Sequence, residues 1–452
     1  MGKDLLIKTL KHEKTDGIPW VPFAGVHAGK LKGYTAEEVL KDADKLFESL
    51  MEVKKIYAPD GMPIMFDLQV EAEILGCDLL WAEDNPPSVK SHPCSGEKTI
   101  PCNCKIPTAD SGRIPMIVDV MKRMKAAVGE EVALYGLICG PFTLASHLRG
   151  SEIFMDMIKD PAYVKELVEF CAEVSCRLSD IYIDAGMDVI AVVDPLVSQI
   201  SPKHFELMLS DSFKATFDYI REKGALSSFF VCGNATRQIK VMCDTNPDSI
   251  SVDENVNLHD SKQVTDPYNI TIGGNIPLTT TMLHGNQQDN MKCVIDLIDD
   301  LDHHNLIISP GCDMPYDTPI ENTVAVAQAV KRTDDARKMI ENYESVEEDI
   351  DITIPDYENR EKVLIELFLL DPEQCAACTY MLNSVVDSYD EIKEMADYVV
   401  YKYTIKEDIA RTKKMGISNL PTMCINGDEK WISIIPDKEE LVNEVKKYFQ
   451  KK

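Results

Sequence analysis

The chain has 452 residues, of which 44% are hydrophobic and 27% charged, and its formal net charge is −29. This composition is typical of a soluble globular protein. A surface this acidic repels phosphate backbones and argues against nucleic-acid binding. No apolar run reaches transmembrane length, and the N-terminus lacks the apolar core of a signal peptide. We therefore expect a cytoplasmic protein with no membrane partner, in which the 14 cysteines serve as thiols, metal ligands or redox centres rather than structural disulfides.

Strand-like apolar runs alternate with amphipathic helical stretches from about residue 60 to residue 330. Repeated β–α units predict a parallel sheet, and about eight units in this length favour a closed (β/α)8 TIM-type barrel over an open sheet. The expected strands are 132–138, 189–193, 228–231, 250–252, 270–272 and 306–309, and the expected helices are 154–183, 202–223, 287–301 and 319–332.

Two cysteines stand where an expected strand gives way to a loop. Cys232 follows the run Phe229-Phe230-Val231, and Cys312 follows Ile307-Ile308-Ser309-Pro310-Gly311. A barrel builds its catalytic face from such junctions. Two thiols at one face can share a soft metal ion or form a redox pair, and the spacing alone leaves both open.

The composition changes after residue 332. We expect a barrel over residues 1–335, an acidic linker over 336–356 and a small second domain over 357–452. In this last part the pattern predicts strands at 363–370, 398–403 and 423–425, a helix at 379–386 opened by Cys375-Ala376-Ala377-Cys378, and a final helix at 438–449.

The CxxC after a strand and at a helix start resembles thioredoxin and glutaredoxin domains over about residues 355–452. Leu420-Pro421-Thr422 matches the cis-proline segment of that family. The resemblance implies that Cys375 is the attacking thiol, that Cys378 is the resolving thiol and that Pro421 packs beside them. Gln374 stands where thioredoxins usually carry tryptophan.

A set of short motifs spans residues 1–335. They are Asp60-Gly61-Met62-Pro63-Ile64-Met65-Phe66-Asp67, Glu71-Ala72-Glu73, Cys139-Gly140-Pro141-Phe142-Thr143, Asp194-Pro195, Ser201-Pro202-Lys203-His204-Phe205, Val231-Cys232-Gly233-Asn234, Ser251-Val252-Asp253 and Pro310-Gly311-Cys312. Together they resemble the uroporphyrinogen decarboxylase superfamily, and most of all its corrinoid-dependent methyltransferase branch.

In that branch a zinc ion is held by a histidine two residues before a cysteine and by a second cysteine in the proline-glycine-cysteine segment. The resemblance implies Cys232 and Cys312 as zinc ligands, but the histidine position is Phe230, which cannot ligate a metal. His27, Asp67, Glu71, Asp194 and Glu254 are the candidate substitutes, of which His27 and Glu71 are carried forward as possible metal ligands. The resemblance also places Asp67, Asp194, Asn234 and Asn275 on the substrate and corrinoid side of the site.

The implied function is methyl transfer between a corrinoid, such as methylcobalamin on a corrinoid protein, and a small donor or acceptor, possibly a thiol. The resemblance leaves a homodimer open. Two other enzymatic functions remain: a thiol–disulfide protein whose barrel cysteines exchange with the CxxC, and a decarboxylase, for which Asp67 matches an acidic residue. The decarboxylase is disfavoured because residues 19–30 contain no arginine to bind a substrate with several carboxylates. A barrel that only binds a ligand is the non-enzymatic alternative.

A further cluster, formed by His92, Cys94, Cys102 and Cys104, lies in a proline-containing loop. The spacing is not that of a zinc finger. A structural metal or redox site and a set of incidental surface thiols are both compatible with it.

Overall fold

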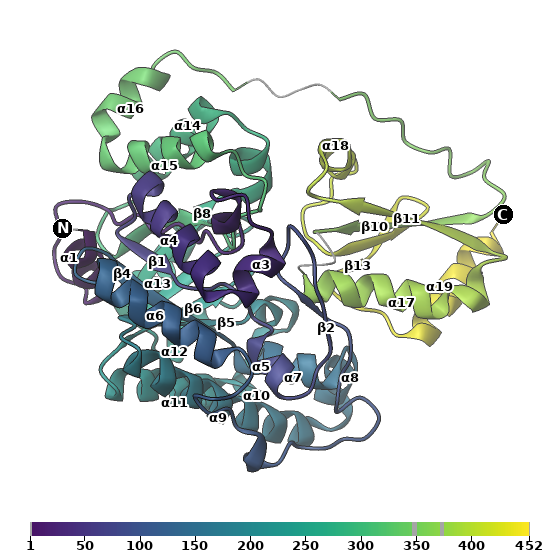
Figure 1. Ribbon diagram of the computed structural model, residues 1–452. Helices are drawn as coiled ribbons and strands as arrows, with labels where there is room; N and C mark the ends of the chain where they lie inside the picture. Colours follow the sequence, from purple (N-terminus) through teal and green to yellow (C-terminus); the bar gives the residue numbers. More distant parts are fainter. Residues whose placement is uncertain (1, 346–349, 371–374, 452) are drawn as a thin grey trace. The chain divides into compact units, whose positions relative to one another are not determined.

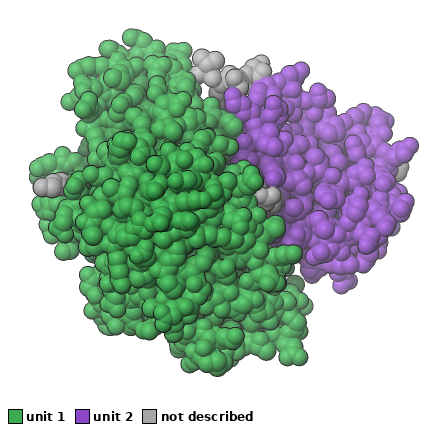
Figure 2. All heavy atoms as spheres, in the orientation of Figure 1, with its two compact units in different colours: residues 1–345 green, residues 346–452 purple. Residues whose placement is uncertain are grey.

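The computed structural model describes residues 2–345, 350–370 and 375–451. The chain divides into two compact units, residues 1–345 and residues 346–452 (Figure 2). Gln374 and residues 346–349 of the expected linker lie outside the described residues. Among the described residues no helix is both long and apolar enough to cross a membrane.

The first unit is built on a curled sheet of seven parallel strands in the order β1-β4-β5-β6-β7-β8-β9. All members of β4, β5 and β7 are buried, because helices cover the outer face and side chains fill the inner one. The strands are β1 (Gly61–Pro63), β4 (Ala133–Cys139), β5 (Val189–Val193), β6 (Leu226–Val231), β7 (Ser249–Val252), β8 (Thr271–Ile276) and β9 (Leu306–Pro310), and a small hairpin pairs β2 (Leu79–Leu80) with β3 (Ser88–Val89).

The segment Pro19–Val21 joins the two edges of this sheet. On one side the Val21 N–H donates to Ile308 O (3.1 Å), and the Ile308 N–H donates to Pro19 O (3.0 Å). On the other side Trp20 O accepts from the Asp60 N–H (2.9 Å). The sheet therefore curls back on itself, an arrangement consistent with a TIM-type barrel.

Helices lie around the outside of the sheet (Figure 1). The helix expected over 154–183 is two helices, because Asp160 accepts the N–H of Tyr163 as an N-cap and Pro161 then starts a new helix. Residues 202–223 are likewise two helices. The bounds are α1 (Gly2–Leu10), α2 (His27–Lys30), α3 (Ala36–Lys41), α4 (Ala43–Tyr57), α5 (Val70–Ile74), α6 (Ile114–Val128), α7 (Pro141–Arg149), α8 (Glu152–Lys159), α9 (Pro161–Asp184), α10 (Pro202–Met208), α11 (Ser210–Glu222), α12 (Ile239–Asp244), α13 (Leu258–Thr265), α14 (Gln287–Asp300), α15 (Ile320–Lys331) and α16 (Thr333–Ile340).

The inner face of the sheet is filled by one apolar cluster. It contains Tyr135 and Leu137 from β4, Val193 from β5, Phe230 from β6 and Ile307 from β9. Cys232 and Cys312 pack against the same cluster and are partly buried. Because side chains alternate along a strand, residue 232 faces the same way as residue 230. The cluster thus forms a floor beneath the two cysteines.

The second unit is a four-stranded sheet with helices of its own. Strand β10 (Val363–Leu369) is central, parallel to β11 (Ala396–Lys402) and antiparallel to β12 (Thr422–Ile425), which pairs with β13 (Asp428–Ile432). The helices are α17 (Ala376–Ile392), α18 (Lys406–Lys414) and α19 (Lys438–Phe449). A separate core that includes Leu367, Met381 and Val445 stabilises this unit.

Candidate functional site

Cys232 and Cys312 meet at the carboxyl edge of the barrel sheet. Cys232 follows β6 directly, and Cys312 comes two residues after β9. Parallel strands bring their carboxyl ends to one edge, which is how residues 80 apart in sequence become neighbours. Their Cα atoms are 5.9 Å apart, and the structure joins the two side chains in a disulfide. Two thiols are thus brought to one place, as the sequence predicts.

The end of β7 holds both cysteine loops. The Asp253 carboxylate accepts the N–H of Gly233, the neighbour of Cys232, and the N–H of Asn255 (2.9 Å). A Cβ atom at Gly311 would lie 2.8 Å from the Glu254 N atom, so only glycine allows this approach. The turn after Cys232 and the turn before Cys312 are therefore both held against Asp253 and Glu254.

Phe230 takes the position that the resemblance gives to a metal-binding histidine. It is fully buried, with its ring centroid 4.8 Å from that of Phe23 and 5.9 Å from that of Phe66. Aromatic pairs at these separations stabilise a core beyond the area they bury. Phe230 is therefore part of the floor of the site and supplies no ligand.

His27 is buried at the start of α2, and both of its ring nitrogens already have partners. Nδ1 lies 2.9 Å from Tyr316 O, and Nε2 lies 2.6 Å from the Tyr57 hydroxyl. Burial lowers the pKa of His27 to about 4, so the ring is neutral at pH 7. To bind a metal, His27 would have to give up one of these hydrogen bonds. The arrangement does not favour the predicted ligand role.

Asp67 and Glu71 lie in a buried polar group beside the end of β4. Asp67 accepts the N–H of Gln69 (2.8 Å) and forms an ion pair of 2.7 Å with Arg113. Glu71 is 1% exposed, and its Oε1 accepts the N–H of Cys139 (2.9 Å). Burial raises the pKa of Glu71 from its ordinary 4.5 to about 7, because the charged form loses hydration. Glu71 is thus partly protonated near neutral pH.

Sequence reasoning missed two members of this polar group. Arg113 ends the loop before α6 and neutralises Asp67 and Glu73, with N–O distances of 2.7 Å to each. Asp313 follows Cys312 directly, and burial raises its pKa well above the usual range. A carboxyl beside a predicted site cysteine is a signal that could have found Asp313. No comparable signal marks Arg113.

The other predicted rim residues support loops. Asp194 accepts from the N–H groups of Phe142 (2.8 Å) and Thr143 (3.1 Å) and so caps α7, and burial raises its pKa to about 7. Asn275 donates to Asp253 O (3.0 Å). The Asn234 side chain accepts the N–H of Thr236 (3.2 Å). These contacts fix the rim, and the predicted substrate and corrinoid roles of the three residues stay predictions.

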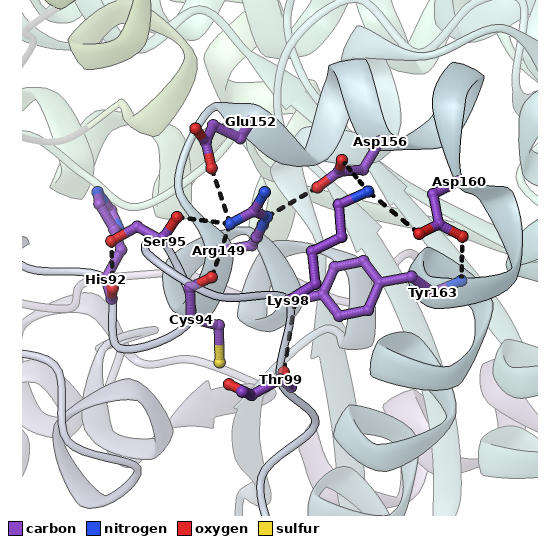
Figure 3. Close-up of polar contacts among 10 residues, drawn as sticks. All are labelled: His92, Cys94, Ser95, Lys98, Thr99, Arg149, Glu152, Asp156, Asp160 and Tyr163. Atoms are coloured by element: carbon purple, nitrogen blue, oxygen red, sulfur yellow. Dashed lines mark hydrogen bonds and ion pairs between the residues drawn. The ribbon is translucent and has the colours of Figure 1, made fainter.

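The loop with His92 and Cys94 is held by Arg149 (Figure 3). Arg149 Nη1 donates to the carbonyl oxygens of Cys94 and Ser95, both at 2.7 Å, and Nε donates to Asp156 (2.7 Å). Cys94 itself is buried, and elsewhere in the loop Cys102 and Cys104 form a disulfide. A structural role fits this loop.

The donor set at the barrel edge does not fit zinc. Zinc takes at least three protein ligands, and here the two cysteines have no third donor because Phe230 is carbon only. Within residues 2–345, 350–370 and 375–451, no group of three or more histidine, cysteine, aspartate or glutamate residues could hold a metal ion. The zinc site implied by the resemblance is therefore not supported by the residues present.

In the second unit Cys375 caps the N-terminus of α17. Its Sγ accepts the N–H of Cys378 (3.2 Å), and the two cysteines form a disulfide. Cys378 is fully buried, whereas Cys375 is partly exposed. Pro421 follows a cis peptide bond and directly precedes β12, the neighbour of the strand that leads to the CxxC.

The barrel unit is similar to known proteins along most of its length. The methylcobamide:CoM methyltransferase MtbA of Methanosarcina acetivorans is 26% identical over 336 residues, which cover 73% of this chain and 97% of that protein. The uroporphyrinogen decarboxylase of Wolbachia pipientis wMel is 26% identical over 302 residues, which cover 65% of this chain and 86% of that protein.

A solved structure agrees on the fold. The structure of a methyltransferase from Methanosarcina mazei superposes with a TM-score of 0.67 at 23% identity, covering 74% of this chain and 98% of that one. The family model for uroporphyrinogen decarboxylase (URO-D) matches residues 1–333. The chain therefore belongs to the uroporphyrinogen decarboxylase family.

Proposed function

We propose that the barrel unit is an enzyme that moves a methyl group between a corrinoid, carried by a corrinoid protein, and a small donor or acceptor. The observation that carries this proposal is the match to nearly the whole length of a methylcobamide:CoM methyltransferase. Support for a site at Cys232 and Cys312 comes from their position at the carboxyl edge of the sheet, because this edge is where barrels bind substrates. Asp67, Asp194, Asn234 and Asn275 are proposed to line the substrate and corrinoid side.

The reactive groups available for the proposed chemistry are the thiols of Cys232 and Cys312 and the carboxyl group of Glu71. Cys232 or Cys312, when reduced, offers a thiol that can act as a nucleophile toward a methyl group. Glu71, with its raised pKa, can hold or release a proton near pH 7. No step is routed through zinc, since the described residues of the barrel offer no third ligand for it.

The test is methyl transfer in both directions with the reduced full-length protein. One arm supplies methylcobalamin and a panel of small thiols, including coenzyme M. The other arm supplies cob(I)alamin and small methylated compounds, and the cobalamin spectrum reports transfer in each. We expect turnover in one arm, a loss of at least tenfold in Cys232→Ser, and no loss in Cys102→Ser. A folded protein that is silent in both arms would contradict the proposal.

Decarboxylation is the weaker candidate. A porphyrinogen with several carboxylates needs free cationic donors. Residues 19–30 contain no arginine, and the side chain of Arg113 already pairs with Asp67 and Glu73. Incubation with uroporphyrinogen under anaerobic conditions checks this directly, and we expect no decarboxylated product.

For the second unit we propose a thioredoxin-like fold and thiol–disulfide exchange. The support is the order β10-α17-β11 followed by β12-β13-α19, the central position of β10, and a CxxC at a helix N-terminus, where the helix dipole stabilises a thiolate. Cys375 would attack, Cys378 would resolve, and Pro421 would support the pair.

This second proposal has its own assay. The full-length protein should accelerate the reduction of insulin disulfides by dithiothreitol. Cys375→Ser should abolish the acceleration. The matched control is Cys424→Ser, which removes a buried thiol of β12 outside the CxxC. Equal rates for the wild type and Cys375→Ser would contradict the assignment.

A further inference from the structure

We propose that Cys232 and Cys312 form a reversible dithiol–disulfide site in the barrel, with a low-molecular-weight or protein dithiol as its reductant. The proposal does not depend on methyl transfer. It starts from the disagreement between the metal site implied by the family resemblance and the donors that this chain provides.

The barrel scaffold brings the two thiols to bonding distance. Their Cα atoms are 5.9 Å apart, near the centre of the range in which a disulfide closes without backbone movement. Asp253 binds the turn after Cys232, and Gly311 lies against the Glu254 N atom, so the end of β7 fixes both sides of the pair. The proximity is therefore a property of the barrel.

No metal competes effectively for the two thiolates. Phe230 occupies the third position and is packed between Phe23 and Phe66. At the end of β7 the carboxylates are engaged: Glu254 accepts the N–H of Leu278 (2.7 Å), and Asp253 accepts from the N–H groups of Asn255 and Gly233. Asp313, which follows Cys312, is buried, but Asp313 and the two cysteines do not form a group that could hold a metal ion. A dithiol that lacks a third ligand is free to oxidise.

The pair is also accessible, unlike most thiols of the barrel unit. Cys232 and Cys312 are partly exposed. Among the unbonded thiols of the described barrel residues, two are partly exposed, and burial raises the pKa of Cys176 to about 11 and of Cys293 to about 12. The others are buried, namely Cys77, Cys94, Cys139, Cys171 and Cys243. The pair is therefore more accessible to exchange than the unbonded thiols, while Cys102 and Cys104 form a separate, exposed disulfide that the Cys102→Ser control removes.

The reaction balances as ordinary thiol–disulfide exchange. A thiolate of the external dithiol attacks one sulfur of the Cys232–Cys312 bond, which breaks and forms a mixed disulfide. The second thiolate of the reductant then attacks that mixed disulfide and closes its own ring. Two electrons and two protons pass from the external dithiol to the barrel, which ends with two thiols.

The first test equilibrates the native full-length protein in buffers with graded ratios of reduced to oxidised glutathione. Thiols are trapped by acid and differential alkylation and quantified by peptide mass spectrometry. We expect Cys232 and Cys312 to change state together in one two-electron transition. Cys232→Ser should leave Cys312 without an internal partner, while Cys102→Ser should leave the transition unchanged. The proposal is overturned if both thiols resist excess oxidised glutathione, or if their disulfide can be reduced only after unfolding.

The second test restores the missing ligand. Reduced wild type and Phe230→Leu should retain far less than one equivalent of zinc after gel filtration, because two thiolates are too few ligands for a stable site. Phe230→His should gain zinc and lose the oxidation of the pair. Wild type that retains one zinc per chain, lost in Cys232→Ser, would overturn the proposal. Circular dichroism confirms folding, and Phe230→Leu controls for disruption of the aromatic floor.

Discussion

At the scale of single residues, the buried carboxyl group of Glu71 makes the stability of the native state depend on pH. Its pKa is raised by burial from 4.5 to about 7. Between these two pH values the native state binds more protons than the unfolded state. The contribution of Glu71 to the free energy of unfolding is therefore fully present below pH 4.5 and is lost as pH rises through 7. By linkage the full effect is about 3 kcal/mol. Glu71→Gln should match the wild type at pH 4.5 and exceed it by up to that amount at pH 8.

Urea unfolding at the two pH values measures the difference. The control is Glu73→Gln, two residues along the same helix, whose carboxylate is more exposed and pairs with Arg113 at 2.7 Å. Its replacement should not reproduce the gain at high pH. If Glu71→Gln and the wild type keep a constant difference from pH 4.5 to pH 8, Glu71 does not titrate as described.

The candidate site was predictable from the sequence only in part. Cys232 and Cys312 could be predicted to meet, because both follow strands of one parallel sheet and such strands end at one edge. The ion pair of Arg113 with Asp67 could not, since it depends on how residues 46 positions apart pack around α5 and α6. The polar partners of His27 come from tertiary contacts of the same kind.

At the scale of elements, Asp194 caps the N-terminus of α7 from a distant position in the sequence. It stands after β5 and accepts the N–H groups of Phe142 and Thr143 and the hydroxyl of Thr143 (2.6 Å) at the start of α7. Asp194→Ala would leave these buried donors without a partner, at a cost of about 3 kcal/mol. Chemical denaturation should show this loss. Ser201→Ala removes an exposed cap of α10 and should cost about 1 kcal/mol. Equal losses would contradict the tertiary cap.

The segment Pro19–Val21 is the element that local sequence patterns could not reveal. Three residues are too few for a periodicity to show, and two prolines flank Trp20 and Val21. By contrast β5 and α19 have the predicted bounds, because their apolar patterns are long and end at clear breaks. The helix predicted over 154–183 is divided at Asp160 and Pro161. A capping residue followed by a proline starts a new helix there, even though the amphipathic pattern runs on without a break.

Hydrogen exchange tests whether this segment joins the sheet edges. The amide of Val21 donates to Ile308, that of Ile308 donates to Pro19, and that of Asp60 donates to Trp20. We expect these three amides to exchange as slowly as those of the interior strand β5. Exchange of the Val21 amide as fast as that of the exposed loop at Gly96 would show that the edges are not joined.

At the scale of the whole molecule, the dominant physical quantity is charge. There are 76 acidic and 47 basic side chains, which give the formal net charge of −29 and a sequence pI near 4.7. Many described basic side chains form surface ion pairs, for example Lys41 with Glu37 and Arg337 with Asp299. Such pairs contribute little each. The excess of carboxylates therefore leaves a net repulsion that favours expanded states.

This repulsion predicts a salt response whose size depends on pH. Added sodium chloride screens charges beyond the Debye length, which is about 10 Å at 0.1 M, so it should weaken the long-range repulsion more than the close ion pairs. The melting temperature should rise between 10 mM and 200 mM salt at pH 8. Near pH 4.7, where the net charge is close to zero, the same change should have little effect or a small opposite one. Differential scanning fluorimetry on the reduced protein measures both series. Sodium sulfate at matched ionic strength is the control that separates charge screening from the exclusion of anions from the protein surface. A melting temperature that falls with added salt at pH 8 would mean that the ion pairs stabilise the protein more than the net charge destabilises it.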